Sequence, residues 1–250
     1  MIVISKVSKN YSVKKVLDNI NITVPQNSIY CLLGKNGAGK TTLINIMSDF
    51  IKPDAGEIFF DNMNYNANEL EIKRNMGVLS EANYLIEELT GYEYLTFVGK
   101  LYGIPKKELK NRIESLAVYF FESVEEIKKV ITHFSTGMKK KLMFCSAVIH
   151  KPRFLLLDEP FEGLDPVASN LLIEFLNRYK INSRVIFLSS HNLDYIEKVA
   201  THIAVLDNSK IIFDGTLSLF LDNGTKNIDE SLLSKLNDYK PRIKEVEWAF

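Results

Sequence analysis

The chain has 250 residues, of which 46% are hydrophobic and 25% charged, the balance of an ordinary globular protein. Its 31 basic and 31 acidic residues cancel, so the net charge does not point to nucleic acid, an acidic membrane face or a polyanionic substrate. No stretch approaches the roughly 18 apolar residues of a membrane-spanning helix, and residues 1–6 do not begin a signal peptide, so we expect a soluble cytoplasmic protein whose work at a membrane would need another polypeptide.

The first part of the chain has the pattern of β-strands. Apolar residues alternate with polar ones over 2–4 and again over 20–24, as in half-exposed sheet. Residues 28–33 form a nearly continuous apolar run, which predicts a buried strand. Residues 58–60 and 76–79 predict two further short strands.

The buried strand leads directly into a glycine-rich loop. Residues 34–41, Gly-Lys-Asn-Gly-Ala-Gly-Lys-Thr, match the phosphate-binding pattern G-x-x-x-x-G-K-[ST]. Glycines let the backbone turn tightly, so that successive amides and the start of the next helix face phosphate oxygens. Lys40 can neutralise the β- and γ-phosphates and the Thr41 hydroxyl can ligate Mg²⁺. The loop therefore predicts a site for ATP and Mg²⁺, rather than a turn without a ligand. We expect the nucleotide to contact Gly34, Asn36, Gly37, Ala38, Gly39, Lys40, Thr41 and Thr42.

From about residue 82 to 149 the pattern changes to that of helices. Five large apolar residues recur at helical spacing and should form a core-facing stripe: Tyr94, Leu95, Val98, Leu101 and Tyr102. A break at 103–105 separates them from a charged helical stretch. Residues 139–141 are three successive lysines, which we expect on a solvated helix face.

Strand patterns return in the second half of the chain. Three apolar runs predict strands and two amphipathic stretches predict helices: strands over 154–157, 185–188 and 203–206, helices over 167–179 and 193–199. This alternation predicts a parallel, doubly wound sheet. A turn at 208–209 leads into a further strand over 211–213. Beyond Thr216 the tail is polar, and a helix over 228–240 would pack on the core.

Two acids follow the strand at 154–157 directly. In an open parallel sheet, ligands bind at the carboxyl ends of the strands, so Asp158 and Glu159 should lie near the phosphate loop. One carboxylate, that of Asp158, can hold Mg²⁺ through water, and Glu159 can polarise an attacking water. The alternative is an ordinary acidic turn before Pro160. Beside a phosphate loop, the pair predicts hydrolysis of ATP to ADP and phosphate.

Further segments, together with these two, resemble the ATP-binding subunits of ABC transporters over residues 2–215. Residues 134–138, Phe-Ser-Thr-Gly-Met, stand in the place of the family signature, and 163–165 look like its D-loop. His191, after the strand at 185–188, resembles the switch histidine. The resemblance implies that His191 contacts the γ-phosphate, and that Glu159, His191 and Lys40 are the catalytic residues.

The resemblance also implies contacts outside the loop. Tyr11 would stack on the adenine, with Val16 packing nearby. Ser135 and Gly137, at the start of a helix, suit a phosphate, and in this family they face the nucleotide of the partner subunit. For each of these residues a purely structural role is the alternative.

Two segments depart from the family pattern. The signature has Thr136 and Met138 where Gly and Gln are usual, and Glu81 stands in the place of the Q-loop glutamine. Both variants resemble the exporter branch that handles drugs, peptides and bacteriocins. Glu81 is then either a further Mg²⁺ ligand beside Thr41 and Asp158 or a surface hinge.

The implied fold is an α/β P-loop NTPase core with a mostly parallel sheet, an N-terminal antiparallel β subdomain and a helical insertion. Residues 1–215 would be the ATPase domain, with its core at 1–81 and 150–215 and the insertion at about 82–149, and residues 216–250 a short C-terminal appendix. The implied function is to power a separate integral membrane permease, for export, through ATP-driven closure of two nucleotide-binding subunits. The chain would then be peripheral on the inner face of the cell membrane, in a homodimer or a heterodimer.

Three other functions compete with this one. A soluble ABC-type ATPase acting on nucleic acid or ribosomes usually has tandem nucleotide domains or a long coiled coil, and neither is present, so no nucleic-acid partner is expected. A small-molecule kinase would share the phosphate loop but would need neither the signature nor His191. A regulatory nucleotide-binding module without turnover would not need Glu159.

Overall fold

The computed structural model describes residues 1–82 and 84–236. Within these residues the larger sheet has six strands in the order β5-β6-β7-β3-β8-β9. The strands from β5 to β8 run parallel, and β9 returns antiparallel to β8. Their bounds are β3 (Ser28–Leu33), β5 (Met76–Leu79), β6 (Phe154–Asp158), β7 (Val185–Ser189), β8 (His202–Asp207) and β9 (Lys210–Thr216). The predicted strands and the predicted, mostly parallel sheet are confirmed.

A second, antiparallel sheet is formed by the N-terminal part of the chain. Its order is β2-β1-β4, with β1 (Ile2–Tyr11), β2 (Lys14–Val24) and β4 (Ala55–Phe60). The inward residues of β1, such as Ile2 and Ile4, are buried, as the alternation predicts. This is the expected N-terminal β subdomain.

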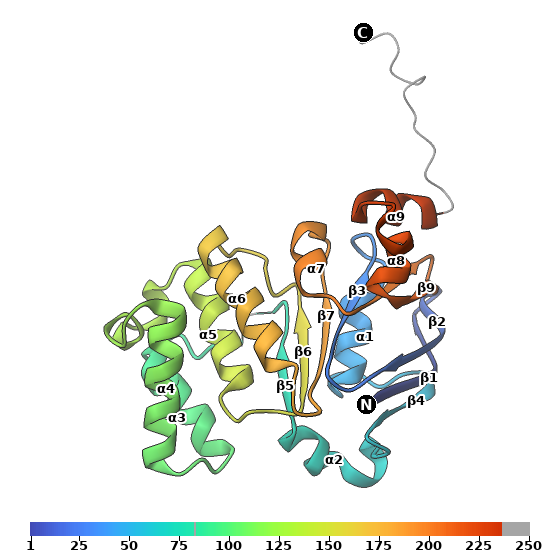
Figure 1. Ribbon diagram of the computed structural model, residues 1–250. Helices are drawn as coiled ribbons and strands as arrows, with labels where there is room; N and C mark the ends of the chain where they lie inside the picture. The colour runs from blue at the N-terminus through green and yellow to red at the C-terminus, as the bar shows by residue number, and fades with distance from the viewer. Residues whose placement is uncertain (83, 237–250) are drawn as a thin grey trace.

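The helices surround the larger sheet unequally (Figure 1). Helix α1 packs between the two sheets, whereas α3, α4 and α5 lie together at the end of the molecule beyond β5 and form the expected helical insertion. Their bounds, with those of the remaining helices, are α1 (Lys40–Met47), α2 (Tyr65–Arg74), α3 (Gly91–Leu101), α4 (Lys106–Phe121), α5 (Thr136–Val148), α6 (Pro166–Tyr179), α7 (Leu193–Val199), α8 (Leu217–Phe220) and α9 (Ile228–Lys235).

The core has two parts, one on each face of the larger sheet. Because side chains alternate along a strand, Tyr30 and Leu32 of β3 face α1 and the smaller sheet, while Ile29 and Cys31 face the other helices. Central strands buried on both faces explain the continuous apolar runs in the sequence. The carboxyl ends of β3, β6 and β7 therefore lie side by side on a rigid base.

Two expectations about the helices are wrong. Leu101, placed in the core-facing stripe, is 71% exposed, because it is the last residue of α3 and projects beyond the packed part of the helix. Lys140, expected on a solvated face, is only 7% exposed, because its position on α5 faces β6.

The C-terminal helix is confirmed over Ile228–Lys235, with Ile228 buried in the core. Residues 237–240 of that prediction lie outside the described residues. Across the described ranges, no helix has both the length and the apolar character needed to cross a lipid bilayer.

Candidate active site

The glycine-rich loop connects β3 to α1 in a conformation that requires glycine. Gly39, the residue before α1, has φ 112° and Gly37 has φ 76°. A Cβ atom on Gly39 would lie 2.9 Å from the carbonyl oxygen of Val16, so a side chain would collide there. The loop is thus fixed both by its own dihedral angles and by its contact with β2, and it presents the start of α1 to solvent.

Lys40 lies under this loop rather than in solvent. Its ammonium is buried and donates a hydrogen bond to the carbonyl oxygen of Gly34 at 2.8 Å. The same nitrogen lies 3.7 Å from Oε1 of Glu159. The structure therefore brings together the loop lysine and one of the two acids that follow β6, as the sequence predicts.

The Asp158 carboxylate is held from the neighbouring strand. Asp158 and Ser189 are paired residues of β6 and β7, and the Ser189 hydroxyl donates a hydrogen bond to Oδ1 of Asp158. The same hydroxyl accepts a hydrogen bond from the backbone N–H of Glu159 at 3.1 Å. Oδ2 of Asp158 is buried and, within the described part of the chain, has no hydrogen-bond partner. A buried carboxylate oxygen in this state suits a cation or a cation-bound water.

Thr41, at the start of α1, and Glu81, which follows β5, are in contact with each other. The Thr41 hydroxyl donates a long hydrogen bond, 3.5 Å, to Oε2 of Glu81. Hydroxyl and carboxylate oxygens are the ligands that Mg²⁺ prefers, so these groups and Asp158 fit the expected metal.

Glu159 and His191 form the other acid–base contact of the site. Oε2 of Glu159 lies 3.0 Å from Nδ1 of His191 and accepts a hydrogen bond from its backbone N–H at 3.2 Å. Glu159 has φ 45°, an unusual value for a residue with a side chain. Such strain is typical of positions where a side chain must point in one direction, here into the cleft.

These groups line a cleft of about 590 Å³. Its lining consists of Tyr11, Lys14, Val16, Asn36, Gly37, Gly39, Lys40, Thr41, Thr42, Glu81, Glu159, Glu162 and His191. Gly34, Ala38 and Asp158 were also predicted but are not among these lining residues. Lys14 and Glu162 were not predicted. Glu162 is three residues beyond Glu159 and Lys14 follows Tyr11 closely, but neither belongs to a recognisable motif.

Ser135 and Gly137 do not line this cleft. Ser135 caps α5, with its hydroxyl accepting the N–H of Met138 at 3.2 Å. A Cβ atom on Gly137 would lie 2.9 Å from the carbonyl oxygen of Gly163. The two segments approach so closely here that a residue with a side chain would not fit.

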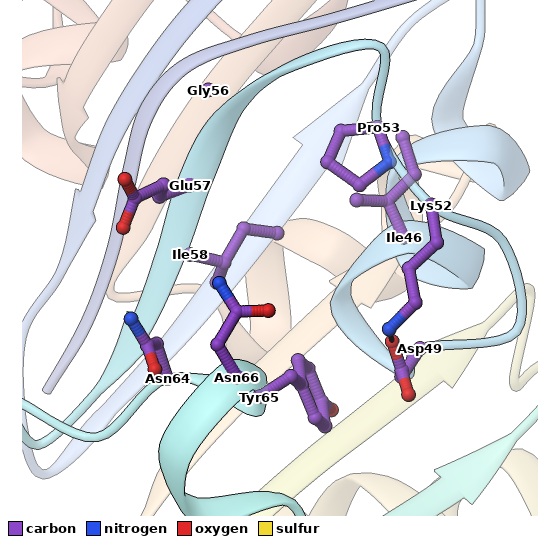
Figure 2. Close-up of a pocket in the computed structure, with 10 residues that line it drawn as sticks. All are labelled: Ile46, Asp49, Lys52, Pro53, Gly56, Glu57, Ile58, Asn64, Tyr65 and Asn66. Atoms are coloured by element: carbon purple, nitrogen blue, oxygen red, sulfur yellow. Dashed lines mark hydrogen bonds and ion pairs between the residues drawn. The ribbon is translucent and has the colours of Figure 1, made fainter.

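Other hollows of the described surface lack this chemistry. Figure 2 shows one of about 90 Å³ near the end of α1, where the Lys52 ammonium points at the Asp49 carboxylate and pairs with it. Lys73 pairs with the same carboxylate at 3.3 Å, so Asp49 is already paired with two lysines. A larger hollow of about 680 Å³, between α3 and α4, has neither a glycine loop nor a carboxylate.

Comparison with known proteins agrees with the geometry. The sequence model of the ABC transporter family matches residues 17–162. The ABC transporter ATP-binding protein NatA of Bacillus subtilis (strain 168) is 30% identical over 242 residues, which are 94% of this chain and 98% of NatA. The bacitracin transport ATP-binding protein BcrA of Bacillus licheniformis is 35% identical over 206 residues, 82% of this chain and 66% of BcrA.

A solved structure described as the ATP-binding subunit of an ABC transporter superposes with a TM-score of 0.87 at 28% identity, covering 94% of this chain and 99% of the other. The fold predicted from the sequence is therefore correct. Since the family match spans more than half of the sequence and NatA aligns over nearly its whole length, the chain belongs to the ABC transporter family, as one of its ATP-hydrolysing, ATP-binding subunits.

Proposed function

We propose that this subunit powers a separate membrane permease that exports a drug, a peptide or a similar compound. The observation that carries the ATP-driven part of this proposal is the position of Glu159, whose carboxylate faces the cleft between the Lys40 ammonium at 3.7 Å and the His191 ring at 3.0 Å. The name of a relative, the bacitracin transport ATP-binding protein BcrA, supports such a cargo.

The chemistry of the site follows from these positions. The loop amides and Lys40 bind the β- and γ-phosphates of ATP, with Tyr11 against the adenine. Thr41 and Asp158, with Glu81, would hold Mg²⁺, which when bound neutralises charge on those phosphates. Glu159 orients a water or accepts its proton, and His191 stabilises charge developing on the γ-phosphate.

We further propose that two subunits complete each other's sites. Ser135 and Gly137 form a helix start suited to phosphate, yet they lie outside the cleft of their own chain. A two-fold arrangement would let this segment of each chain cover the nucleotide of the other, which a single chain cannot do. Contacts that exist only with the γ-phosphate present would then favour the closed pair, and hydrolysis would release it.

The permease would dock beside the helical region. A hollow of about 370 Å³ there is lined by residues from the turn after α1 and from α2, β5, α3 and α5. Phe50, on its edge, and Tyr84 are both exposed, with ring centroids 6.1 Å apart. Exposed aromatic pairs beside a groove are typical of protein interfaces. In this proposal the chain is held at the membrane by its partner.

The variant Glu159→Gln tests the catalytic part. It keeps the shape of the side chain but removes the base, so ATP binding should persist while phosphate release falls by at least 100-fold, within the range typical of a lost general base. An ATP-dependent dimer should then accumulate in size-exclusion chromatography. Glu162→Gln, which changes another cleft acid, should retain most of the turnover. Normal hydrolysis by Glu159→Gln would remove this residue from the catalytic role.

Affinity purification from membranes tests the transport part. The tagged chain should recover an integral membrane protein, and Phe50→Arg with Tyr84→Arg should lose that protein while keeping ATP hydrolysis. Recovery of ribosomes or DNA by the unaltered chain would support the soluble ATPase instead.

A further inference from the structure

The three successive lysines of α5 have different surroundings. Lys139 pairs with Glu87 at 2.7 Å, and the Lys141 ammonium lies 4.7 Å from the centroid of the Phe121 ring. Lys140 is 7% exposed, and its ammonium donates a hydrogen bond to the carbonyl oxygen of Asp158 at 3.4 Å. A lysine is almost never this buried unless negative charge compensates it, and one carbonyl oxygen is not enough.

The Lys140 ammonium lies at the acid pair of the active site, because the carbonyl group that it contacts belongs to Asp158, and Glu159 is the next residue. Burial lowers the pKa of Lys140, and this effect is opposed by four carboxylates, those of Glu162, Asp158, Glu159 and Glu81. Three of these acids, Glu81, Glu159 and Glu162, line the nucleotide cleft. Lys140 therefore lies behind the wall of the cleft, on the side where the acids gather.

The charge of this wall presents a problem for a nucleotide. ATP brings several negative charges to a cleft where carboxylates are concentrated. Repulsion between these like charges lowers the affinity for ATP. Lys40 faces only one of the acids within ion-pair distance, Glu159. Lys140 is a second buried cation at this wall, and it offsets the negative charge of the acids whether or not a metal ion is bound.

The position of Lys140 along the chain adds a mechanical role. Its helix begins at the cap Ser135, and its ammonium reaches the last residue of β6. One side chain thus ties the segment proposed to face the partner's nucleotide to the strand that carries Asp158.

We propose that Lys140 is a positioning residue that supplies the positive charge an acid-rich cleft needs to admit ATP, while holding α5 against the carboxyl end of β6. This rests on the proposed function, since it assumes that ATP binds in this cleft. It concerns a residue outside the phosphate loop and behind the surface of the cleft.

Calorimetric titration of ATP into the full-length chain in EDTA tests the proposal without hydrolysis. Lys140→Met should weaken metal-free ATP binding on the order of tenfold, the size expected when a partly buried charge is removed. Lys140→Arg should retain most of the affinity. Lys139→Met, the matched control on the same helix, should bind within twofold of the unaltered chain.

Removal of one acid should then reverse the effect. In the Lys140→Met background, Glu81→Gln should recover most of the lost affinity, because it removes the negative charge that Lys140 had offset. Lys140→Gln keeps a hydrogen-bond donor for Asp158 but no charge, and it should lose as much affinity as Lys140→Met; it replaces that variant if thermal unfolding shows that Lys140→Met is not folded.

Three results would overturn the proposal: Lys140→Met or Lys140→Gln binding within twofold of the unaltered chain, an equal loss in Lys139→Met, or no recovery with Glu81→Gln. If the unaltered chain itself bound no ATP in the presence of Mg²⁺, the proposed function would fail, and this proposal with it. The two failures are therefore distinguishable.

Discussion

The Ser189→Ala substitution examines how the buried carboxylate of the site is supported. Ser189 is fully buried, and its hydroxyl donates to Oδ1 of Asp158 and accepts from the N–H of Glu159. A hydrogen bond to a charged group contributes about 1.5–3 kcal/mol and a neutral one about 1 kcal/mol. Removing both should lower the free energy of unfolding by about 3 kcal/mol, which in a chain of this size lowers Tm by about 10 °C.

Urea unfolding without nucleotide measures this difference directly. Ser190→Ala is the matched control, because Ser190 is equally buried but its hydroxyl accepts, among the described residues, a single neutral hydrogen bond, from the N–H of Asn192 at 3.1 Å. It should cost about 1 kcal/mol. If Ser189→Ala destabilised the protein no more than Ser190→Ala does, the Asp158 carboxylate would not depend on the serine, and the account of its support would be wrong.

Three further predictions concern the glycine loop, Lys40 and His150. Gly39→Ala should lower the free energy of unfolding in urea by more than 2 kcal/mol, roughly the sum of dihedral strain and a steric clash, because its Cβ would meet Val16. Gly37→Ala, whose Cβ would lie in open space, should lower it by about 1 kcal/mol. Equal losses of stability would contradict this reasoning. Lys40→Ala should weaken ATP binding at least about tenfold in calorimetry, as expected for loss of a charged contact to phosphate, and unchanged binding would rule out the phosphate-loop assignment. Burial holds the pKa of His150 at about 4, below its unfolded value of about 6.5, so the unfolded chain binds the proton first and stability falls as pH drops from about 6.5 to 4, by about 3 kcal/mol. His150→Gln should remove that part of the pH dependence of urea unfolding, and an unchanged dependence would count against a buried neutral histidine.

The strands of the core could be predicted because their signal is local. A strand buried on both faces needs an uninterrupted apolar run, and β3, β6 and β7 each have one. Helix α2 was not predicted because only Ile72 of it is buried, so the sequence has no apolar periodicity there. Its start depends instead on the Asn64 side chain, which caps the N–H of Ala67, a weaker signal in a polar stretch.

The residues of the site likewise fall into those that the sequence alone predicts and those that need the fold. The glycine loop and the Asp158–Glu159 pair are contiguous motifs whose chemistry follows from residue types and spacing, so the sequence alone brings them together. The hydroxyl of Ser189 reaches Asp158 only because β6 and β7 are neighbours in register, and this requires the strand order. Glu162 and Lys14 enter the cleft by the path of the chain after a motif, which no spacing rule predicts.

Glu81 and Lys140 show why charge in such a site has to be counted in three dimensions. By itself, a carboxylate in the place of the family's glutamine adds a negative charge beside Thr41 and predicts a cleft less favourable to ATP. By itself, a lysine among lysines on α5 predicts an exposed helix face. Burial of the Lys140 ammonium against the end of β6 changes both conclusions, because the added negative charge then has a cation behind the same wall. The electrostatic character of the cleft is set by this sum, and neither residue can be interpreted without the other.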